Sequence, residues 1–303
     1  MTASPGAGAA RGLPAAAGEG AGPVHVAAAG PGARPPGLPT ALDGRVVFVA
    51  GAGSAGPGYS IGRASSITYA RLGARVCVVD RDATSAAETT ALIRAEGGWA
   101  ETFVGDVSVE ADVLRLFAQA RATCGPIDAL HHNVGIGKTG GPIETSVADF
   151  DHVHAVNVRS LLLAAQQVLP EMVARGRGAI VTVASVAGIR YVGYPHLAYS
   201  VTKAALMQFT RMIAQQYAAA GVRANVVVPG LIDTPRIAKT VAGMFSTTSL
   251  DEARAARDRQ VPMGRMGSAW EVAHACAFLL SDAASYVTGT ELCVDGGLIG
   301  KYA

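Results

Sequence analysis

The sequence predicts an α/β fold: a doubly wound parallel sheet with helices on both faces, in a single domain. Two observations support this prediction. Short apolar runs recur along the chain, and segments with helical spacing separate them. Within the runs, hydrophobic residues occupy consecutive positions, which is typical of strands that are buried on both faces of a parallel sheet.

The composition of the 303-residue chain excludes several classes of protein. Half of the residues are hydrophobic, so the chain as a whole has enough apolar surface to form a core. No apolar stretch reaches the roughly 18 residues that a membrane-spanning helix needs. The 25 basic and 23 acidic residues leave no basic surplus for a nucleic-acid partner.

The four cysteines lie far apart in the sequence and form no Cys-x-x-Cys pair. No histidine stands at zinc-ligand spacing from them, so we expect no metal site and a location in the cytoplasm. Cys77 and Cys293 lie in apolar, strand-like runs, where a buried reduced thiol is expected.

Residues 1–40 differ in composition from the remainder. Alanine, glycine and proline make up 28 of these 40 residues, and no apolar periodicity is present. We interpret this segment as a disordered leader, and residues 41–303 as the folded domain. A mitochondrial presequence and an overlong translation start stay open as alternatives.

The first strand, Arg45–Ala50, is a continuous apolar run, and the glycine-rich turn after it leads into a helix to about Leu72. The second strand, Arg75–Val79, is valine-rich and ends in Asp80, and Ala83–Glu96 then has helical spacing. The later strands are again short apolar runs: Thr102–Val104, Ala129–His132, Ala179–Ala184, Arg223–Val228 and Glu291–Val294. The later helices have apolar residues at helical spacing: Glu110–Thr123, Phe150–Ala174, Ala198–Ala220 and Glu271–Leu280.

A glycine-rich loop follows the first strand. Gly51-Ala52-Gly53-Ser54-Ala55-Gly56 fits the G-x-G-x-x-G template of dinucleotide-binding folds. Glycines let the backbone approach a pyrophosphate, whose charge then lies at a helix N-terminus. Pro57-Gly58 cannot continue a helix, so we expect the helix to begin near Ser60-Ile61-Gly62. The pattern predicts a Rossmann-type sheet with a loop longer than the minimal motif.

The residues after the second strand indicate which dinucleotide is bound. The Asp80 carboxylate can accept hydrogen bonds from the hydroxyls of the adenosine ribose, and it would repel a 2′-phosphate. Arg81 beside it would attract that phosphate. We expect NAD to be favoured over NADP.

Tyr199 and Lys203 are four residues apart, which places a phenol and an ammonium on one face of a helix. A nearby cation favours the ionised form of a phenol, so this pair is suited to proton transfer. The pair follows the fifth strand and Ser185, in a chain whose pattern already predicts a dinucleotide-binding fold.

With these motifs in order, the sequence resembles the short-chain dehydrogenase/reductase family over about residues 43–300. The motifs that carry the resemblance are the Gly51–Gly62 loop, Asp106-Val107, His132-Asn133-Val134-Gly135, Asn157, Ser185, Tyr199 with Lys203, Pro229-Gly230 and Asp295-Gly296-Gly297. It implies an NAD(P)-dependent enzyme that interconverts a secondary alcohol and a ketone. It also implies a homotetramer or dimer, built through the helices at Phe150–Ala174 and Tyr199–Ala220.

The resemblance assigns roles to four catalytic residues. Tyr199 is expected to be the general acid/base, and Ser185 to hydrogen-bond the reacting oxygen. Lys203 is expected to hold the nicotinamide ribose and to favour the ionised tyrosine. Asn157 is expected to anchor a water molecule in the proton relay.

Further residues are expected at the cofactor. Asp106 and Val107 would meet the adenine, and Ile232 and Thr234 the nicotinamide amide and the phosphates. The full expected set is Gly51, Gly53, Ser60, Ile61, Gly62, Asp80, Arg81, Asp106, Val107, Asn133, Gly135, Tyr199, Lys203, Ile232 and Thr234. Residues 231–262 match the family's mobile substrate lid, in which the charge-rich Asp251–Arg259 is expected to be a solvated helix.

Departures from the family pattern concern the cofactor end. The usual Thr-Gly opening is Ala50-Gly51, and the usual Asn-Asn-Ala-Gly motif is His132-Asn133-Val134-Gly135. His131 and His132 are expected to point to opposite faces of their strand and to have a role in the core or in a loop rather than as paired metal ligands. The three ring residues Tyr191, Tyr194 and His196 stand in a loop that the family uses for the substrate pocket.

Two other functions are compatible with parts of this pattern. An enoyl-thioester reductase also tolerates a longer glycine loop with Ser60-Ile61, but such enzymes resemble a Tyr-x6-Lys pattern, and here that position is His196. A dinucleotide-binding sensor without turnover needs no acid/base group. The presence of Asn157, Ser185, Tyr199 and Lys203 together argues against it.

Overall fold

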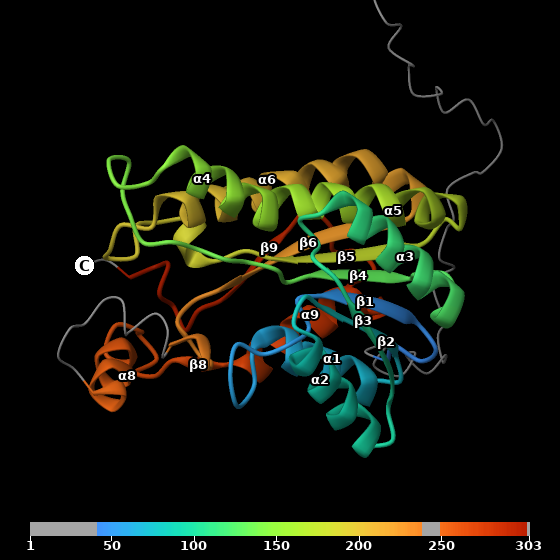
Figure 1. Cartoon of the computed structure of the whole chain (residues 1–303), viewed down its shortest axis with the longest axis horizontal. Helices are drawn as coiled ribbons and strands as arrows, with labels where there is room; N and C mark the ends of the chain where they lie inside the picture. The colour runs from blue at the N-terminus through green and yellow to red at the C-terminus, as the bar shows by residue number, and fades with distance from the viewer. Residues whose placement is uncertain (1–40, 238–248, 302–303) are drawn as a thin grey trace, which may run out of the picture. The chain divides into compact units, whose positions relative to one another are not determined.

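Seven parallel strands form the central sheet of the computed structural model, which describes residues 41–237 and 249–301 (Figure 1). The strand order is β3-β2-β1-β4-β5-β6-β9, so the winding of the chain reverses between β1 and β4. The strands are β1 Val46–Ala50, β2 Arg75–Asp80, β3 Trp99–Val104, β4 Ala129–His132, β5 Gly178–Val183, β6 Val222–Pro229 and β9 Glu291–Val294. By their contacts, Leu38–Ala303 form one unit.

Helices cover both faces of this sheet, as Figure 1 shows. One face packs against α3, α5 and α6, and the other against α1, α2 and α9. The helices are α1 Ile61–Arg71, α2 Ala83–Ala95, α3 Glu110–Cys124, α4 Val147–His154, α5 Ser160–Ala174, α6 Leu197–Tyr217, α8 Leu250–Asp258 and α9 Ala269–Leu280. No helix within residues 41–237 or 249–301 is long and apolar enough to cross a membrane.

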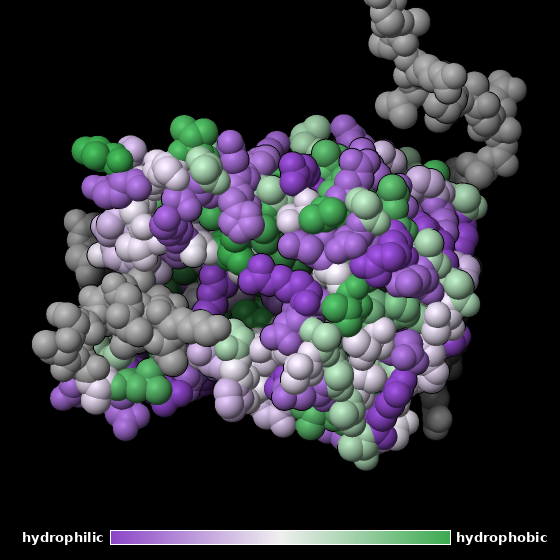
Figure 2. Space-filling view, in the orientation of Figure 1, coloured by the Kyte–Doolittle hydropathy of each residue, from purple (hydrophilic) through white to green (hydrophobic). Residues whose placement is uncertain are grey.

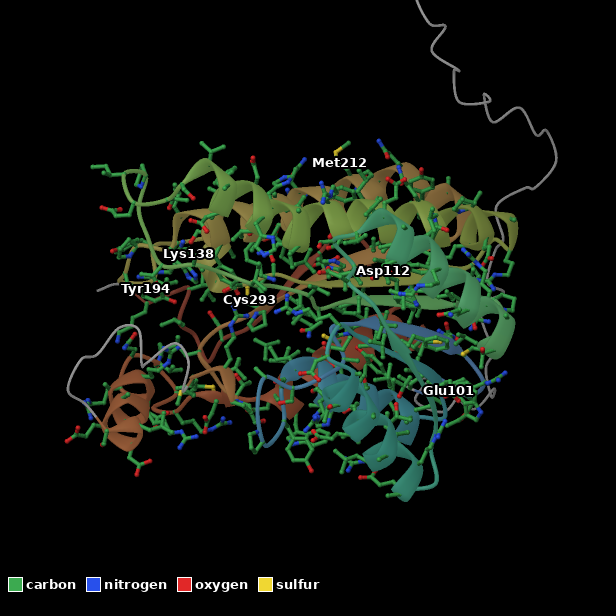
Figure 3. The ribbon with its side chains drawn as sticks, in the orientation of Figure 1. Glu101, Asp112, Lys138, Tyr194, Met212 and Cys293 are labelled. Atoms are coloured by element: carbon green, nitrogen blue, oxygen red, sulfur yellow. The ribbon has the colours of Figure 1, made fainter. Side chains whose placement is uncertain are left out.

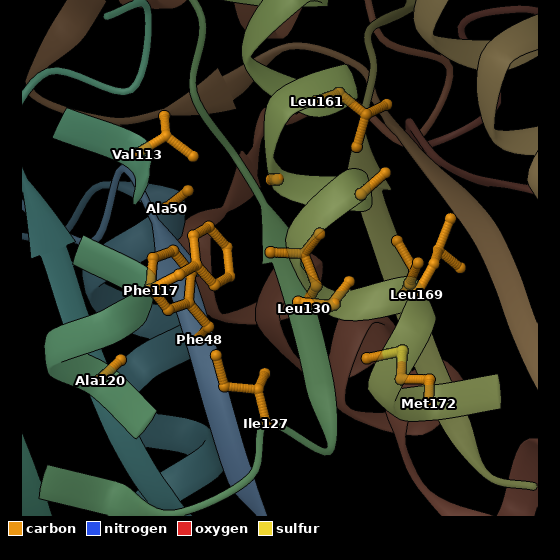
Figure 4. Packing of buried hydrophobic residues seen from close by; sticks show 14 of the residues in the cluster. Phe48, Ala50, Val113, Phe117, Ala120, Ile127, Leu130, Leu161, Leu169 and Met172 are labelled. Atoms are coloured by element: carbon orange, nitrogen blue, oxygen red, sulfur yellow. The ribbon is translucent and has the colours of Figure 1, made fainter. Parts of the chain in front are cut away.

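The core under α3 and α5 fixes the two central strands (Figure 4). Phe48 of β1 stacks on Phe117 of α3, with ring centroids 4.0 Å apart and planes 10° from parallel. Leu130 of β4 and Met172 of α5 are fully buried in the same cluster. Burying a side chain of this size contributes about 1.5–3 kcal/mol. The two strands at which the winding reverses are therefore held firmly.

The predicted fold class is confirmed, and most elements begin and end within three residues of the expected positions. The helix expected over Phe150–Ala174 is divided by a π-helical turn, Ala155–Arg159. A second, two-stranded parallel sheet has no sequence signal: β7 Ile232–Asp233 pairs with β8 Gly267–Ser268. The leader expected at residues 1–40, and residues 238–248 of the expected lid, lie outside the described part of the chain.

The prediction for the thiols is wrong for one of the two. Cys77 is fully buried in β2, whereas Cys293 is exposed. The apolar run around Cys293 forms β9, which is the edge strand of the sheet, and its neighbours on that strand are only partly buried. An apolar run at a sheet edge is not covered as a central strand is.

Helix α1 approaches the end of β1 more closely than any side chain would allow. A Cβ atom on Gly62 would lie 1.9 Å from the carbonyl oxygen of Gly51 and 2.7 Å from Nδ2 of Asn133. A Cβ atom on Gly56 would meet Cβ of Pro235 at 3.4 Å, which is an ordinary contact. Helix α1 begins at Ile61, as predicted, so the glycine that packs helix against strand is Gly62.

Gly62→Ala is therefore expected to lower the free energy of unfolding by about 3 kcal/mol, because the added methyl group overlaps backbone atoms of β1. Gly56→Ala is the matched control, and we expect a change below about 1 kcal/mol. Urea denaturation followed by circular dichroism measures both. Equal losses in the two variants would contradict the assignment of the close contact to Gly62.

Candidate active site

The predicted site residues gather at one edge of the sheet. Because all neighbouring strands are parallel, their carboxyl ends share this edge. The order of strands reverses between β1 and β4, where open α/β sheets bind their ligands. The residues that follow the successive strands are Gly51 after β1, Asp80 at the end of β2, Asp106 after β3, Asn133 after β4, Ser185 after β5 and Ile232 after β6.

Asp80 holds the glycine-rich loop in place. Its Oδ2 accepts a hydrogen bond of 2.9 Å from the amide of Gly53, and its Oδ1 accepts one of 3.1 Å from the amide of Asp82. A Cβ atom on Gly53 would lie 2.8 Å from Oδ2 of Asp80, so only glycine fits there. A carboxylate has about four acceptor positions, so Asp80 can still accept hydrogen bonds from a ribose.

Ser85 of α2 also holds this loop, and sequence reasoning missed it. Its Oγ accepts a 2.6 Å hydrogen bond from the amide of Ser54 and donates one of 3.0 Å to the carbonyl of Ser54. Ser60 closes the loop from the other end, with its Oγ 2.9 Å from that of Ser54. Nothing in the chain marks Ser85, because it is one of several small polar residues in its helix.

The residues expected at the adenine are ordered by local contacts. Oδ1 of Asp106 accepts hydrogen bonds from the amide and hydroxyl groups of Ser108, at 2.8 and 2.7 Å. Val107 is partly buried against the core. Arg81, at the neighbouring strand end, is exposed.

The end of β4 is tied to both halves of the site. Nδ2 of Asn133 donates a 2.9 Å hydrogen bond to the carbonyl of Gly51. Gly135 lies against Lys203, since a Cβ atom there would be 3.0 Å from its Nζ. Nε2 of His132 lies 2.8 Å from Oγ of Ser160, whereas His131 contacts Tyr69. Both histidines are fully buried, as predicted, and burial lowers the pKa of each to about 3.

Asn157 lies in the π-helical turn and links the β4 loop to α6. Its Oδ1 accepts a hydrogen bond from the amide of Ile136, and its Nδ2 donates to the carbonyl of Ile136 and to Oγ1 of Thr202, all between 2.8 and 2.9 Å. Such turns recur at functional sites. Both amide hydrogens are engaged, which leaves the second lone pair of Oδ1 for the predicted water molecule.

The first turns of α6 bring the predicted proton-transfer pair together. Nζ of Lys203 lies 5.5 Å from the centroid of the Tyr199 ring. The imidazole ring of His196 stacks on the Tyr199 ring, with centroids 4.6 Å apart and planes 15° from parallel. Cζ of Arg236 lies 5.6 Å from the same centroid. Tyr199 is thus surrounded by two cations and one imidazole.

Lys203 is almost fully buried, and its Nζ donates a 2.8 Å hydrogen bond to the carbonyl of Val183 at the end of β5. Burial, and secondly the charge of Arg236, lower the pKa of Lys203 to about 7. Ser185 follows Val183 by two residues, and its Oγ accepts a hydrogen bond from the amide of Ala187. The short helical turn after Ser185 lies directly on α6, because a Cβ atom on Gly188 would be 2.7 Å from the amide nitrogen of Ala204.

The segment after β6 faces the glycine-rich loop. Ile232 is buried, and Thr234 is partly buried. Pro235 is in contact range of Gly56 and Gly58. The structure therefore brings together the glycine-rich loop and the segment after β6, both of which are expected to contact the phosphates of the cofactor.

The predicted substrate end is hollowed in Figure 2, with hydrophilic residues at its rim and hydrophobic residues deeper inside. Tyr194 and Lys138 lie on neighbouring loops at this end (Figure 3). The solvated helix expected at Asp251–Arg259 is α8, which begins with a capping box and buries only Ala253.

Sequence reasoning missed Arg236. It falls inside the expected lid, two residues after Thr234, and carries no motif of its own. Its position beside Ile232 and Thr234, which are expected at the nicotinamide, is the feature of the sequence that could have indicated its role.

Comparison with known proteins identifies relatives along most of the chain. A family model described as enoyl-(acyl carrier protein) reductase matches residues 55–299. The 2-(S)-hydroxypropyl-CoM dehydrogenase 3 of Xanthobacter autotrophicus is 37% identical over 244 residues, which cover 80% of this chain and 94% of that protein. The cis-4-hydroxycyclohexanecarboxylate dehydrogenase of Sinomonas cyclohexanicum is 38% identical over 255 residues, covering 84% and 96%.

Solved structures agree with this. A Burkholderia xenovorans protein described as a short-chain dehydrogenase/reductase superposes with a TM-score of 0.82 at 40% identity, covering 86% of this chain and 99% of that one. Given these matches, and the ordered motifs at one sheet edge, the chain belongs to the short-chain dehydrogenase/reductase family.

Proposed function

We propose that the protein is an NAD-dependent dehydrogenase or ketoreductase that interconverts a secondary alcohol and a ketone, with Tyr199 as general acid/base. The observation that carries this proposal is the buried Lys203 ammonium, which lies 5.5 Å from the centroid of the Tyr199 ring and against Gly135, after the end of β4. A proton donor with a neighbouring cation at a dinucleotide-binding edge is suited to carbonyl reduction.

The residues present fit a nicotinamide dinucleotide. Gly53 and Gly62 have no room for a Cβ atom, because Asp80 and Ser85 lie against the first and Gly51 and Asn133 against the second, so the loop packs closely at the start of α1, where a helix N-terminus would receive a diphosphate. Lys203 has three ammonium hydrogens, and within the described residues only the carbonyl of Val183 receives a hydrogen bond from it. The remaining hydrogens would bind the hydroxyls of the nicotinamide ribose.

In the direction of reduction, a reduced nicotinamide held at this edge of the sheet would supply the hydride that the carbonyl carbon needs. The hydroxyl of Tyr199 gives its proton to the carbonyl oxygen, and Ser185 orients that oxygen by a hydrogen bond. The charge of Lys203 stabilises the negative charge that develops on the phenol oxygen. Solvent returns the proton, so one ketone and one proton yield one alcohol as the reduced cofactor is oxidised. Alcohol oxidation is the reverse.

The names of the two relatives support a secondary alcohol as the substrate class, since 2-hydroxypropyl and 4-hydroxycyclohexane groups are both secondary alcohols. The description of the matching family model names enoyl reduction. His196 stands at the position of the tyrosine in the Tyr-x6-Lys pattern of such enzymes, and its ring stacks on that of Tyr199. Because the chain lacks the tyrosine of that pattern, we favour a ketone over an enoyl thioester as the substrate.

The choice of NAD rests on Asp80, whose carboxylate lies where an adenosine ribose would be bound. A gluconate 5-dehydrogenase from Burkholderia cenocepacia, 29% identical with a TM-score of 0.76 over 87% of this chain and 98% of that one, was solved with NADP and tartrate. That relative binds NADP, so in this chain the proposed preference for NAD depends on Asp80 outweighing Arg81.

We also propose a homo-oligomer, a dimer or tetramer, that buries the outer face of α4, α5 and α6. Val147, Leu162, Val201 and Met212 are exposed on these helices. Met212 points away from the sheet in Figure 3. Exposed apolar side chains on neighbouring helices are typical of a subunit interface.

Tyr199→Phe is expected to lower kcat for ketone reduction by about a thousand-fold, because the proton donor is lost. The dissociation constant for NADH should stay within about three-fold of wild type, because the ring and its stacking are kept. Tyr286→Phe, at a fully exposed tyrosine beside the amino ends of the strands and away from the site, is the control. Stopped-flow absorbance and NADH fluorescence measure the two quantities. A Tyr199→Phe enzyme with near-normal turnover would refute the assignment.

Wild-type protein is expected to bind NADH at least about ten-fold more tightly than NADPH, because Asp80 repels a 2′-phosphate. Asp80→Asn keeps an acceptor for the amide of Gly53 but removes the negative charge. It should therefore reduce the difference between the affinities for NADH and NADPH. Arg81→Met should leave the NADH affinity unchanged. Fluorescence titration measures all three. Preferential NADPH binding by wild type would assign the discrimination to Arg81.

Lys203→Met is expected to raise the free energy of unfolding of the cofactor-free protein, most strongly below pH 7. The pKa of Lys203 is lowered to about 7 in the folded protein, whereas an unfolded lysine titrates near 10.4. Below pH 7 the lysine is charged in both states, so folding bears the full cost of burying the ammonium. Between about pH 7 and 10 the folded protein gives up that proton first, and the cost shrinks as pH rises.

Urea denaturation of both proteins near pH 6 and pH 9 measures the difference, which should be about 2 kcal/mol or more at the lower pH. Tyr217→Phe serves as a control for mutation of a partly buried α6 residue outside the site. A wild-type protein that is more stable than Lys203→Met near pH 6 would contradict the expected cost.

A further inference from the structure

Two cysteine thiols meet in the core between the sheet and helix α3. Cys77 lies in β2, and Cys124 is the last residue of α3. Their Sγ atoms are 3.2 Å apart, the thiol of Cys77 donates a hydrogen bond to the sulfur of Cys124, and both thiols are free. A disulfide bond is about 2.05 Å long, so the two sulfur atoms need to approach each other by only about 1 Å.

The packing around the pair fixes the distance between the two thiols. Cys77 stands beside Phe48 of β1 in the register of the sheet, and the ring of Phe48 stacks on Phe117 of α3 (Figure 4). Cys124 follows Phe117 by two helical turns, so both side chains lie on the face of α3 that covers the sheet. All four residues belong to one buried cluster. The stacked rings therefore hold α3 at the distance from β2 at which the sulfur atoms meet.

The two thiols are buried in different surroundings. Cys77 is in a strand with β1 on one side and β3 on the other. Cys124 is also buried, but it stands where α3 ends, and the nearby Thr123 and Pro126 are exposed. The last turn of a helix frays more readily than its middle, so a small oxidant can reach Cys124 without unfolding of the domain.

A cation lies beside Cys124. Arg75 precedes Cys77 on the same face of β2, stacks on the ring of Trp99 with its Cζ 4.3 Å from the ring centroid, and donates a 3.4 Å hydrogen bond to the carbonyl of Thr123. The hydrogen bond from Cys77, and secondly the charge of Arg75, lower the pKa of the Cys124 thiol. The same hydrogen bond and burial raise the pKa of Cys77. Because the thiolate is the reactive form, Cys124 is the thiol that reacts first.

We propose that Cys77 and Cys124 form a redox modification site, which hydrogen peroxide converts into an internal disulfide. The thiolate of Cys124 attacks one peroxide oxygen, so that an S–O bond forms, the O–O bond breaks and hydroxide leaves. The thiol of Cys77 then gives up its proton and attacks the sulfur of Cys124, so that the S–S bond forms, the S–O bond breaks and water leaves. Two thiols are thereby oxidised, and one peroxide is reduced to two water molecules.

This inference goes beyond the proposed ketoreductase activity and does not depend on it. The two cysteines are 47 positions apart, and the chain between them carries Asp80, α2, β3 and Asp106. The disulfide would therefore close a loop around the part of the domain that is expected to bind the adenosine of the cofactor. A crosslink between positions so far apart restricts the unfolded chain, so the oxidised protein is expected to be the more stable form.

The first test identifies the bond in the unmutated, folded chain. The protein is treated with a small molar excess of hydrogen peroxide, the peroxide is removed, and the remaining thiols are blocked with iodoacetamide in urea. Trypsin cleaves after Arg75 and Arg81 and after Arg121 and Lys138, so the two cysteines fall in separate peptides. Mass spectrometry should find these two peptides joined, and dithiothreitol should separate them.

The second test measures thermal stability by circular dichroism. Oxidation should raise the melting temperature by about 5 °C or more, and dithiothreitol should reverse the rise. Cys124→Ala and Cys77→Ala should each abolish both the joined peptides and the rise. Melting in reducing buffer first establishes that each variant folds, and the peptide test on the unmutated chain decides the matter for a variant that does not fold.

Cys293→Ser is the matched control, because it removes an exposed thiol on the edge strand β9 and leaves the pair intact. It should give the same joined peptides and the same rise in melting temperature as wild type. Modification of Cys293 with Cys77 and Cys124 still open to iodoacetamide would overturn the proposal. So would joined peptides that form only when peroxide is added in urea, or an equal rise in melting temperature in Cys124→Ala.

Discussion

The carbonyl group of Gly51 is the point on which the site depends. Its oxygen accepts a hydrogen bond from Asn133 of the β4 loop, and the bare Cα of Gly62 at the start of α1 packs against it. One peptide group thus sets the distances between β1, β4 and α1, at the place where the winding of the sheet reverses. The Phe48–Phe117 stack packs the same strand, β1, against α3 in the core.

The proton-transfer end of the site contains a side chain whose burial is unfavourable. Lys203 is enclosed by the β4 loop and the end of β5, with one carbonyl as its acceptor in the described residues. Such an ammonium is destabilising until its other hydrogens are satisfied. Hydrogen bonds from Asn157 to Ile136 and Thr202 hold the β4 loop against α6, the helix that carries Lys203. Function and stability are therefore opposed at this residue.

Sequence alone predicted what depends on local pattern. Valine-rich runs fixed the central strands, and Pro57-Gly58 correctly moved the helix start to Ile61. The π-helical turn around Asn157 was not predicted, because the apolar spacing of Phe150–Ala174 is continuous. The contact of Asn157 with Thr202 of α6 joins segments that are far apart in the sequence, so no local pattern marks the turn. Ser85 and Arg236 were missed for the same reason: their roles exist only once distant segments meet. Cys293 was misplaced because sequence does not show which strand ends the sheet.

The small β7–β8 sheet has a consequence for how the family varies. Its parallel pairing brings residues 232–233 and 267–268 together, so the segment between them leaves and rejoins the domain at one place. Once the ends are joined, the entropy of closing such a loop grows only slowly with its length, by about 0.6 kcal/mol per doubling. A change in the length of the chain between these two strands would therefore cost the central sheet little stability. Thr234 and Arg236 lie in that stretch, so such a change would act on the reacting end of the site rather than on the core.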